Sequence, residues 1–294
     1  MRWILAILLA AAPAAAQNGL RQQVRAIADQ AQGKVSTACW LEGAPLNCDL
    51  NPHGHPPMQS VFKLPLGIAV LHQVEQGKLK LDQPVRFQPS DRILPHAYSP
   101  LQDKYPQAGV DVPLSELLRL TVSLSDNVAA DILLRLAGGP AVVNSYIASL
   151  GIRGFHLVDN ENALHHQKDL QYRNWFEPAG AVELLRMIDQ RSPLNSANTA
   201  FLLEIMSAPP EKTRLGADLP AGTKIAHKTG SSDVDNGLAH ATNDIGLITL
   251  PDGRKLAVAV FVTDSRADEA TRIRVIAEIG KAAYDAAAAQ HRAR

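Results

Sequence analysis

Three short motifs hold the residues of this chain whose types and spacing suit serine chemistry. They are Ser60-Val61-Phe62-Lys63, Ser125-Asp126-Asn127 and Lys228-Thr229-Gly230, in that order. From average composition, the first should occur roughly once by chance in a chain of this length, and each of the others on the order of a tenth of the time or less. Their ordered occurrence together predicts one site for acyl transfer through a serine.

The first motif supplies a nucleophile. Ser60 and Lys63 stand at the start of a predicted helix, and side chains three positions apart project to one helix face. A serine hydroxyl becomes a good nucleophile when a neighbour removes its proton. A lysine can do this where burial and nearby cations lower its pKa. The alternative, a helix-capping Ser60 beside a surface lysine, would be favoured if this motif stood alone.

The second motif lies between two predicted helices. Ser125 could pass a proton to a leaving nitrogen, and Asn127 could bond a substrate amide. The simpler interpretation of Asp126 is a cap on the following helix.

The third motif ends a predicted strand. Lys228 would place a positive charge near Ser125 and a substrate carboxylate, and Gly230 would permit close approach of a substrate backbone. The alternative for Lys228 is a solvated charge at a sheet edge. The backbone N–H groups of Ser60 and Ser231 are the predicted oxyanion hole.

These residues need a scaffold, and the residue patterns predict one of the α+β class. The predicted strands are residues 35–42, 47–51, 223–229, 244–250 and 255–263. The predicted helices are residues 19–31, 61–76, 113–124, 128–136, 141–150, 178–190, 195–206 and 267–289. Strands near both termini predict a sheet that joins the early hairpin to the late strands, with a helical domain inserted between them.

The resulting division has an α/β sandwich domain with an antiparallel five-stranded sheet (17–59 and 208–294) and an all-helical domain (60–207), with the site in the cleft between them. Residues 82–106 and 155–177 are predicted to be loops, the second long enough to suggest a function. Pro65 should distort its helix locally, because it lacks a backbone donor.

The first residues have the pattern of a targeting segment. Arg2 precedes an apolar run over 3–12, and Ala14-Ala15-Ala16 suits cleavage before Gln17. Residues 1–16 are therefore predicted to be a signal peptide, and the protein is expected in the periplasm. The alternative is a retained membrane anchor, although the run is short for a bilayer span.

The predicted export affects how the two cysteines are interpreted. Cys39 and Cys48 flank a predicted turn, and an oxidising compartment would allow them to form a disulfide. Two free buried thiols are the alternative; a zinc site is disfavoured because no third ligand is near. The formal net charge is zero, which argues against a nucleic-acid partner.

The motifs resemble those of the class A serine β-lactamases, over nearly all of the chain after residue 16. Glu161-Asn162-Ala163-Leu164, with Arg173 and Pro178 after it, is similar to that family's omega loop. The resemblance implies that Glu161 activates the water that releases the acyl group. It also implies a monomer that acts on β-lactams without metal or organic cofactor, and without a membrane partner after signal cleavage.

Finer features resemble the extended-spectrum PER/VEB branch. They are Pro57-Met58-Gln59-Ser60, His227-Lys228-Thr229-Gly230-Ser231-Ser232 and Ala241-Thr242-Asn243-Asp244-Ile245-Gly246. The resemblance implies substrate binding by Asn127, Lys228, Thr229, Gly230, Ser231, Arg214 and Tyr98, the last as the aromatic wall of the cleft. It also suggests hydrolysis of oxyimino-cephalosporins.

One position departs from most of that family. His165 stands four residues after Glu161, where most class A enzymes have asparagine, although PER-type enzymes share the histidine. His165-His166 is interpreted as structural rather than metal-binding. Two other functions stay open: a D-alanyl-D-alanine peptidase, which needs no loop glutamate, and a β-lactam sensor that is acylated without turnover.

Overall fold

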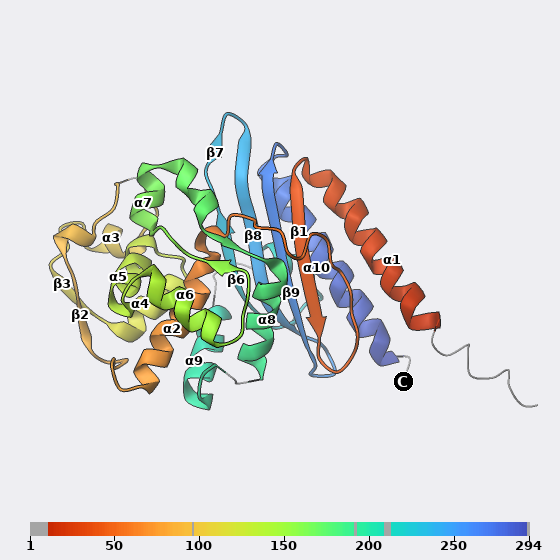
Figure 1. The fold of residues 1–294 in the computed structure, drawn as a ribbon, viewed down its shortest axis with the longest axis horizontal. Helices are drawn as coiled ribbons and strands as arrows, with labels where there is room; N and C mark the ends of the chain where they lie inside the picture. The colour runs from red at the N-terminus through yellow and green to blue at the C-terminus, as the bar shows by residue number, and fades with distance from the viewer. Residues whose placement is uncertain (1–10, 96, 191–192, 209–212, 293–294) are drawn as a thin grey trace, which may run out of the picture.

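A single antiparallel sheet organises the structure. The computed structural model describes residues 11–95, 97–190, 193–208 and 213–292. The sheet order is β1-β9-β8-β6, with β7 beside β8 (Figure 1). The strands are β1 (Lys34–Leu41), β6 (Ile225–Ser231), β7 (Val234–Asp235), β8 (Leu238–Thr249) and β9 (Lys255–Ser265). Lys34 pairs with Thr263, so the predicted union of early and late strands in a five-stranded sheet is confirmed.

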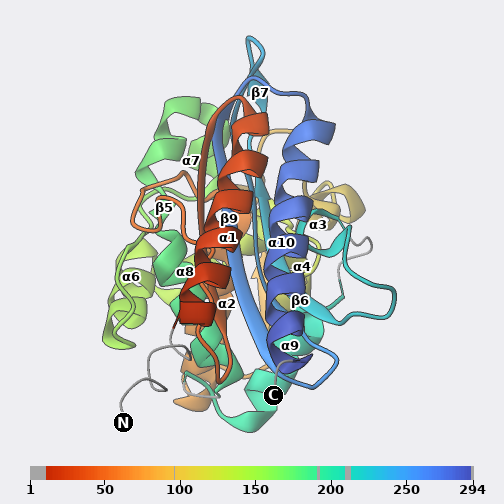
Figure 2. The ribbon, with the colours of Figure 1, turned by 90° about the vertical axis from the view of Figure 1, so that its right-hand side faces the viewer.

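Both faces of the sheet are buried, which explains its continuous apolar strands. In β9, alternate residues face opposite sides: Val258, Val260 and Val262 join one apolar cluster, whereas Ala257, Ala259 and Phe261 join the other. The first cluster lies under α1 (Ala11–Ala28) and α10 (Glu269–Arg292). These two helices lie side by side and run in opposite directions (Figure 2).

The second cluster joins the sheet to the helical part of the chain (Figure 1). Its helices are α2 (Lys63–Glu75), α3 (Pro100–Lys104), α4 (Leu114–Val122), α5 (Asn127–Ala137), α6 (Pro140–Ser149), α7 (Glu161–His166), α8 (Pro178–Asp189) and α9 (Ser196–Met206). Every residue from Lys63 to Leu71 is buried. Helix α2 is therefore the central element of this part of the chain, and α4, α5, α6 and α9 pack against it.

Short elements complete the chain. The 3-10 turns are η1 (Asp29–Ala31), η2 (Gln59–Phe62), η3 (Pro89–Asp91), η4 (Lys168–Arg173) and η5 (Arg214–Gly216). Two small hairpins pair β2 (Pro84–Phe87) with β3 (Val110–Pro113), and β4 (Phe155–His156) with β5 (Trp175–Phe176).

Three sequence predictions of local structure are wrong. Residues 155–177 are not all loop, because they contain α7 and the paired strands β4 and β5. Residues 47–51 form no strand but only a bridge between Leu50 and Thr37; the Asn47 side chain accepts a hydrogen bond from the Asp49 N–H at 3.0 Å, and such local bonds compete with a strand ladder. Residues 82–106 are not all loop, because β2 pairs with a strand that lies more than twenty residues further along the chain.

Pro65 is the third residue of α2, because this helix begins two residues later than predicted. Backbone N–H groups in a first helical turn have no intrahelical acceptor, so the proline removes no hydrogen bond from the helix. The expected irregularity lies before it, as the 3-10 turn η2 that carries Ser60.

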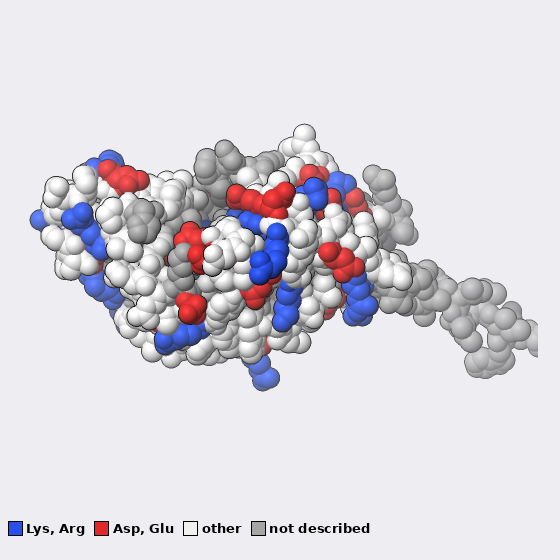
Figure 3. Space-filling view, turned by 90° about the horizontal axis from the view of Figure 1, so that it is seen from above, with Lys and Arg blue, Asp and Glu red and all other residues white. Residues whose placement is uncertain are grey.

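Residues 1–10 of the predicted signal peptide lie outside the described residues, and residues 11–16 begin α1. Among the described helices, none is long and apolar enough to span a membrane. On the face seen in Figure 3, basic and acidic side chains are interspersed rather than gathered by sign.

The predicted disulfide between Cys39 and Cys48 is present. It closes a loop with a sequence separation of 9. Replacing both cysteines by serine should lower the free energy of unfolding by about 2–3 kcal/mol, because the unfolded chain gains loop entropy. Urea denaturation measures this change. Wild-type protein under reducing conditions is the matched control and should lose a similar amount; an unchanged midpoint in both would contradict the prediction.

Candidate active site

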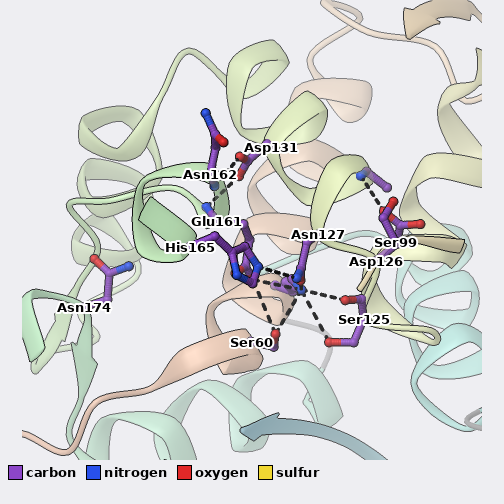
Figure 4. A network of polar contacts seen from close by, with 12 residues as sticks. Ser60, Ser99, Ser125, Asp126, Asn127, Asp131, Glu161, Asn162, His165 and Asn174 are labelled. Carbon is purple, nitrogen blue, oxygen red and sulfur yellow. Dashed lines mark hydrogen bonds and ion pairs between the residues drawn. The ribbon is translucent and has the colours of Figure 1, made fainter. Parts of the chain in front are cut away.

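Ser60, Lys63 and Glu161 meet where η2 enters α2. Lys63 Nζ lies 2.9 Å from Ser60 Oγ and 2.9 Å from Glu161 Oε1. Ser60 Oγ lies 3.4 Å from the same glutamate oxygen. Figure 4 shows Ser60 and Glu161 brought together from different elements. Two groups able to accept the serine proton are thus within reach of it.

Ser125 lies between two lysines. Lys228 Nζ donates to Ser125 Oγ at 3.0 Å, and Lys63 Nζ lies 3.4 Å from the same oxygen. Lys63 also donates to the Ser125 carbonyl oxygen at 2.7 Å. Burial, and then the charge of Lys63, hold the pKa of Lys228 well below its usual range. The arrangement can carry a proton between Lys63 and Ser125.

The turn that presents Ser125 is held by Asp126. The Asp126 carboxylate accepts hydrogen bonds from the Ala129 N–H and the Ser99 hydroxyl, both at 2.8 Å. The predicted helix cap is therefore confirmed, with the added function of fixing the segment that carries Tyr98. Tyr98 itself is 56% exposed, and its carbonyl oxygen accepts from the Asn127 N–H at 3.3 Å.

The Asn127 amide contacts a lysine at one end and a histidine at the other. Its Oδ1 accepts from Lys63 Nζ, and its Nδ2 lies 3.0 Å from His165 Nε2. His165 therefore joins the site through Asn127 (Figure 4). Among the described residues, no group of histidine, cysteine or carboxylate side chains is suited to a metal ion.

Asp131 is a site residue that sequence reasoning missed. Its carboxylate accepts hydrogen bonds from the N–H groups of Glu161, at 2.8 Å, and Asn162, at 2.9 Å (Figure 4). Burial, and then the charge of Glu161, raise the pKa of Asp131 to about 7. A sequence signal existed, because Asp131 is the one acidic residue of α5 and lies one turn after Asn127.

Strand β6 forms the opposite wall. A Cβ at Gly230 would lie 2.7 Å from the Met58 carbonyl oxygen and 3.2 Å from the Ser60 nitrogen. In the structure, the close approach that requires this glycine is to the segment that presents Ser60. The neighbouring Thr229 carbonyl accepts from Lys228 Nζ at 3.0 Å.

Arg214 supports the end of β6 from behind. Its guanidinium donates to the Gly230 carbonyl at 2.9 Å and to the Ser231 hydroxyl at 2.5 Å. Its backbone φ of 52° lies in the left-handed region, which is uncommon for a residue with a Cβ. Burial lowers the pKa of Arg214. The arginine places positive charge beside the Ser231 hydroxyl.

A cavity of about 90 Å³ opens between the two walls. It is lined on one side by Ser60, Glu161, His165 and Gln171, and on the other by residues that include Ser231 and His240. Residues 155–177, from here on the omega loop, form the first wall together with η2. The loop is fastened to η2 by a hydrogen bond of 2.7 Å between Gln59 Nε2 and Gln171 Oε1.

A sheet domain facing a helical layer, with a serine, a buried lysine and a glutamate in contact between them, defines a serine enzyme able to form and release an acyl group. Comparison with known proteins agrees. The sequence profile of the "Beta-lactamase enzyme family" matches residues 18–287. The chain belongs to the β-lactamase enzyme family, and within it to class A.

Two curated relatives come from Pseudomonas aeruginosa. The chain is 42% identical to the extended-spectrum β-lactamase PER-1, over 90% of this chain and 86% of that protein. It is 35% identical to β-lactamase VEB-1, over 80% and 79%. A solved β-lactamase from Chitinophaga pinensis is 45% identical with a TM-score of 0.88, covering 92% of this chain and 100% of that one. These relatives confirm the expected PER/VEB resemblance.

The raised pKa of Asp131 gives a prediction for stability. An acid whose pKa is higher in the folded state contributes stability that is complete below its unfolded value of 3.8 and is lost as pH rises through about 7. Asp131→Asn removes this titration, so the stability of wild type relative to the variant should fall between those two pH values. Urea denaturation at several pH values measures it, with Asp111→Asn, a surface carboxylate, as control. A difference that does not vary with pH would contradict the prediction.

Gly230→Ala should separate β6 from η2. The added methyl group has no room beside the Met58 carbonyl oxygen and the Ser60 nitrogen, and overpacking of this kind costs about 1–3 kcal/mol. Displacing the serine should also slow acylation by about 100-fold. Stopped-flow acylation and thermal denaturation measure both effects. Gly19→Ala, where no atom lies within 4 Å of the new Cβ, is the control. Wild-type acylation by Gly230→Ala would refute the packing argument.

Proposed function

We propose that the chain hydrolyses the amide bond of the β-lactam ring through an acyl-enzyme on Ser60, and so confers resistance to β-lactam antibiotics. The observation that carries this proposal is the contact of Ser60 with both Lys63, at 2.9 Å, and Glu161, at 3.4 Å. A nucleophile, a base and a carboxylate for a second step are thereby combined. Family membership supports the same reaction.

In the first step, Ser60 Oγ attacks the ring carbonyl carbon while its proton passes through water to Glu161, or to Lys63 when that residue is a neutral amine. The backbone N–H groups of Ser60 and Ser231 hold the oxyanion. Because a Cβ added at Gly230 would lie only 3.2 Å from the Ser60 nitrogen, the backbones that carry these two groups run close together. Ser125 then returns a proton to the ring nitrogen as the C–N bond breaks.

In the second step, Glu161 takes a proton from a water molecule, which attacks the ester carbonyl and frees Ser60. The two backbone bonds to Asp131 fix the start of the helix that carries Glu161. A peptidase of the cell wall or a non-turnover sensor would not need a carboxylate here. The contact of Glu161 with Ser60 and Lys63 therefore favours the lactamase over both alternatives.

Substrate binding is assigned to the other residues of the cleft. Asn127 bonds the acyl amide, Lys228 and Thr229 bind the carboxylate, and Gly230 and Ser231 present the edge of β6. Arg214 strengthens the carboxylate site through its bond to the Ser231 hydroxyl, at 2.5 Å. The exposed side chain of Tyr98 forms an aromatic wall of the cleft. The name of PER-1 as an extended-spectrum enzyme supports oxyimino-cephalosporins as substrates.

The sequence pattern is also our basis for proposing the location of the protein, its oligomeric state and its domain boundaries. Residues 1–16 act as a signal peptide, and the mature protein is a periplasmic monomer without cofactor. Its domains are 17–59 with 208–294, and 60–207. The disulfide between Cys39 and Cys48 supports an oxidising compartment.

Glu161→Ala tests whether Glu161 is needed for release of the acyl group but not for acylation. The variant should still be acylated by a cephalosporin, because Lys63 remains beside Ser60, but it should release the product at least about 100-fold more slowly. Stopped-flow absorbance should then show a burst of ring opening equal to the enzyme concentration, followed by almost no turnover. Glu183→Ala, on the exposed side of α8, is the control. Rapid steady turnover by Glu161→Ala would remove the assignment.

A further inference from the structure

Three side chains fasten the omega loop to the sheet on the outer side of the cavity. Tyr172, in η4, donates its hydroxyl proton to Asp264 Oδ1 at 2.5 Å, and its oxygen lies 2.6 Å from His240 Nδ1. His240 belongs to β8 and Asp264 to β9. These three residues, here named the clasp, join segments that are far apart in the sequence.

Within the clasp, the hydrogen-bond donors and acceptors of the three side chains match one another. The Tyr172 hydroxyl gives its proton to Asp264, and it accepts one from His240 when the histidine is protonated on Nδ1. Partial burial, and then the bond to Asp264, raise the pKa of Tyr172. The hydroxyl therefore remains a donor throughout the physiological pH range. On its other side, His240 Nε2 lies 3.6 Å from Asp235 Oδ2.

The clasp spans the two walls of the active-site cavity. Gln171, the residue before Tyr172, lines the cavity from the omega loop, and His240 lines it from the sheet. On its inner side Gln171 is bonded to Gln59 at 2.7 Å. Two adjacent residues therefore hold the omega loop: Gln171 is bonded to η2, and Tyr172 is bonded to the sheet. Both bonds oppose a movement of the loop that would widen the cavity.

The width of the cavity matters for substrates. Its volume is about 90 Å³, whereas sites that enclose a drug-sized ligand measure roughly 300–1,000 Å³. A compact acyl side chain demands little displacement of the walls. A branched or aromatic one would have to displace the walls further, and a movement of the omega loop away from β8 would stretch the clasp.

We propose that the clasp sets the width of the acyl-side-chain pocket, so that Tyr172 and Asp264 are positioning residues that select β-lactams by the bulk of this group. The proposal rests on the proposed β-lactam hydrolysis. Neither residue is placed among the groups that react. Their effect is transmitted through the position of the omega loop, and it should therefore differ between substrates that share a ring but not a side chain.

The test uses two cephalosporins with the same ring substituent, one with a compact acyl chain and one with a branched oxyimino chain. In Tyr172→Phe, the ratio of kcat/KM for the bulky over the compact substrate should rise about 10-fold, through a lower KM for the bulky one. Asp264→Gly removes the acceptor of the same bond, and glycine tolerates the φ of 50° at this position. It should give the same change even if Tyr172→Phe folds poorly.

Tyr146→Phe is the matched control, since it removes a tyrosine hydrogen bond to the Pro193 carbonyl oxygen, away from the cavity. It should leave the ratio unchanged. In the double variant Tyr172→Phe/Asp264→Gly the effects should not add, because both changes remove the same hydrogen bond between Tyr172 and Asp264.

An unchanged ratio, or an equal fall in kcat/KM for both substrates, would overturn the proposal. Wild-type protein that opens neither ring would instead overturn the proposed function, so the two failures are distinguishable.

Discussion

The buried ammonium group of Lys63 is the constraint on which the site depends. Its side chain is fully inaccessible to solvent, and an unpaired charge there would be strongly destabilising. Lys63 is satisfied by Ser60, Glu161 and the Ser125 carbonyl, at 2.9, 2.9 and 2.7 Å, and by Asn127. These partners come from η2, α7, the turn before α5 and α5 itself. Pairing this one charge thus requires the helical layer to bring together the groups to which we assign the reaction.

The need to pair the buried Lys63 also explains why residues with a supporting role lie close to the groups that react. Glu161 can neutralise Lys63 only if α7 begins at the right place, and Asp131 fixes that beginning through two backbone bonds. Gly230 lets β6 approach the serine from the opposite side. The omega loop is therefore attached to α5 near Glu161 and to the sheet near Tyr172.

Much of this arrangement could be predicted from residue types. The three motifs identified Ser60, Ser125 and Lys228, because their chemistry is tied to short local spacings. The β9 strand was evident because its residues are apolar on both faces. Asp131 and Asp264 were not found, because each acts through a residue distant in sequence and neither belongs to a local pattern. The strand β2 was missed for the same reason, since only its pairing with β3 makes it a strand.

The most direct test of the central claim is rapid acid quenching of wild-type protein mixed with a cephalosporin, followed by peptide mapping by mass spectrometry while ring opening is recorded optically. The account predicts an adduct on the peptide that contains Ser60 during turnover, and its complete disappearance once substrate is exhausted. An adduct that persists after ring opening stops, or that maps to another residue, would contradict it.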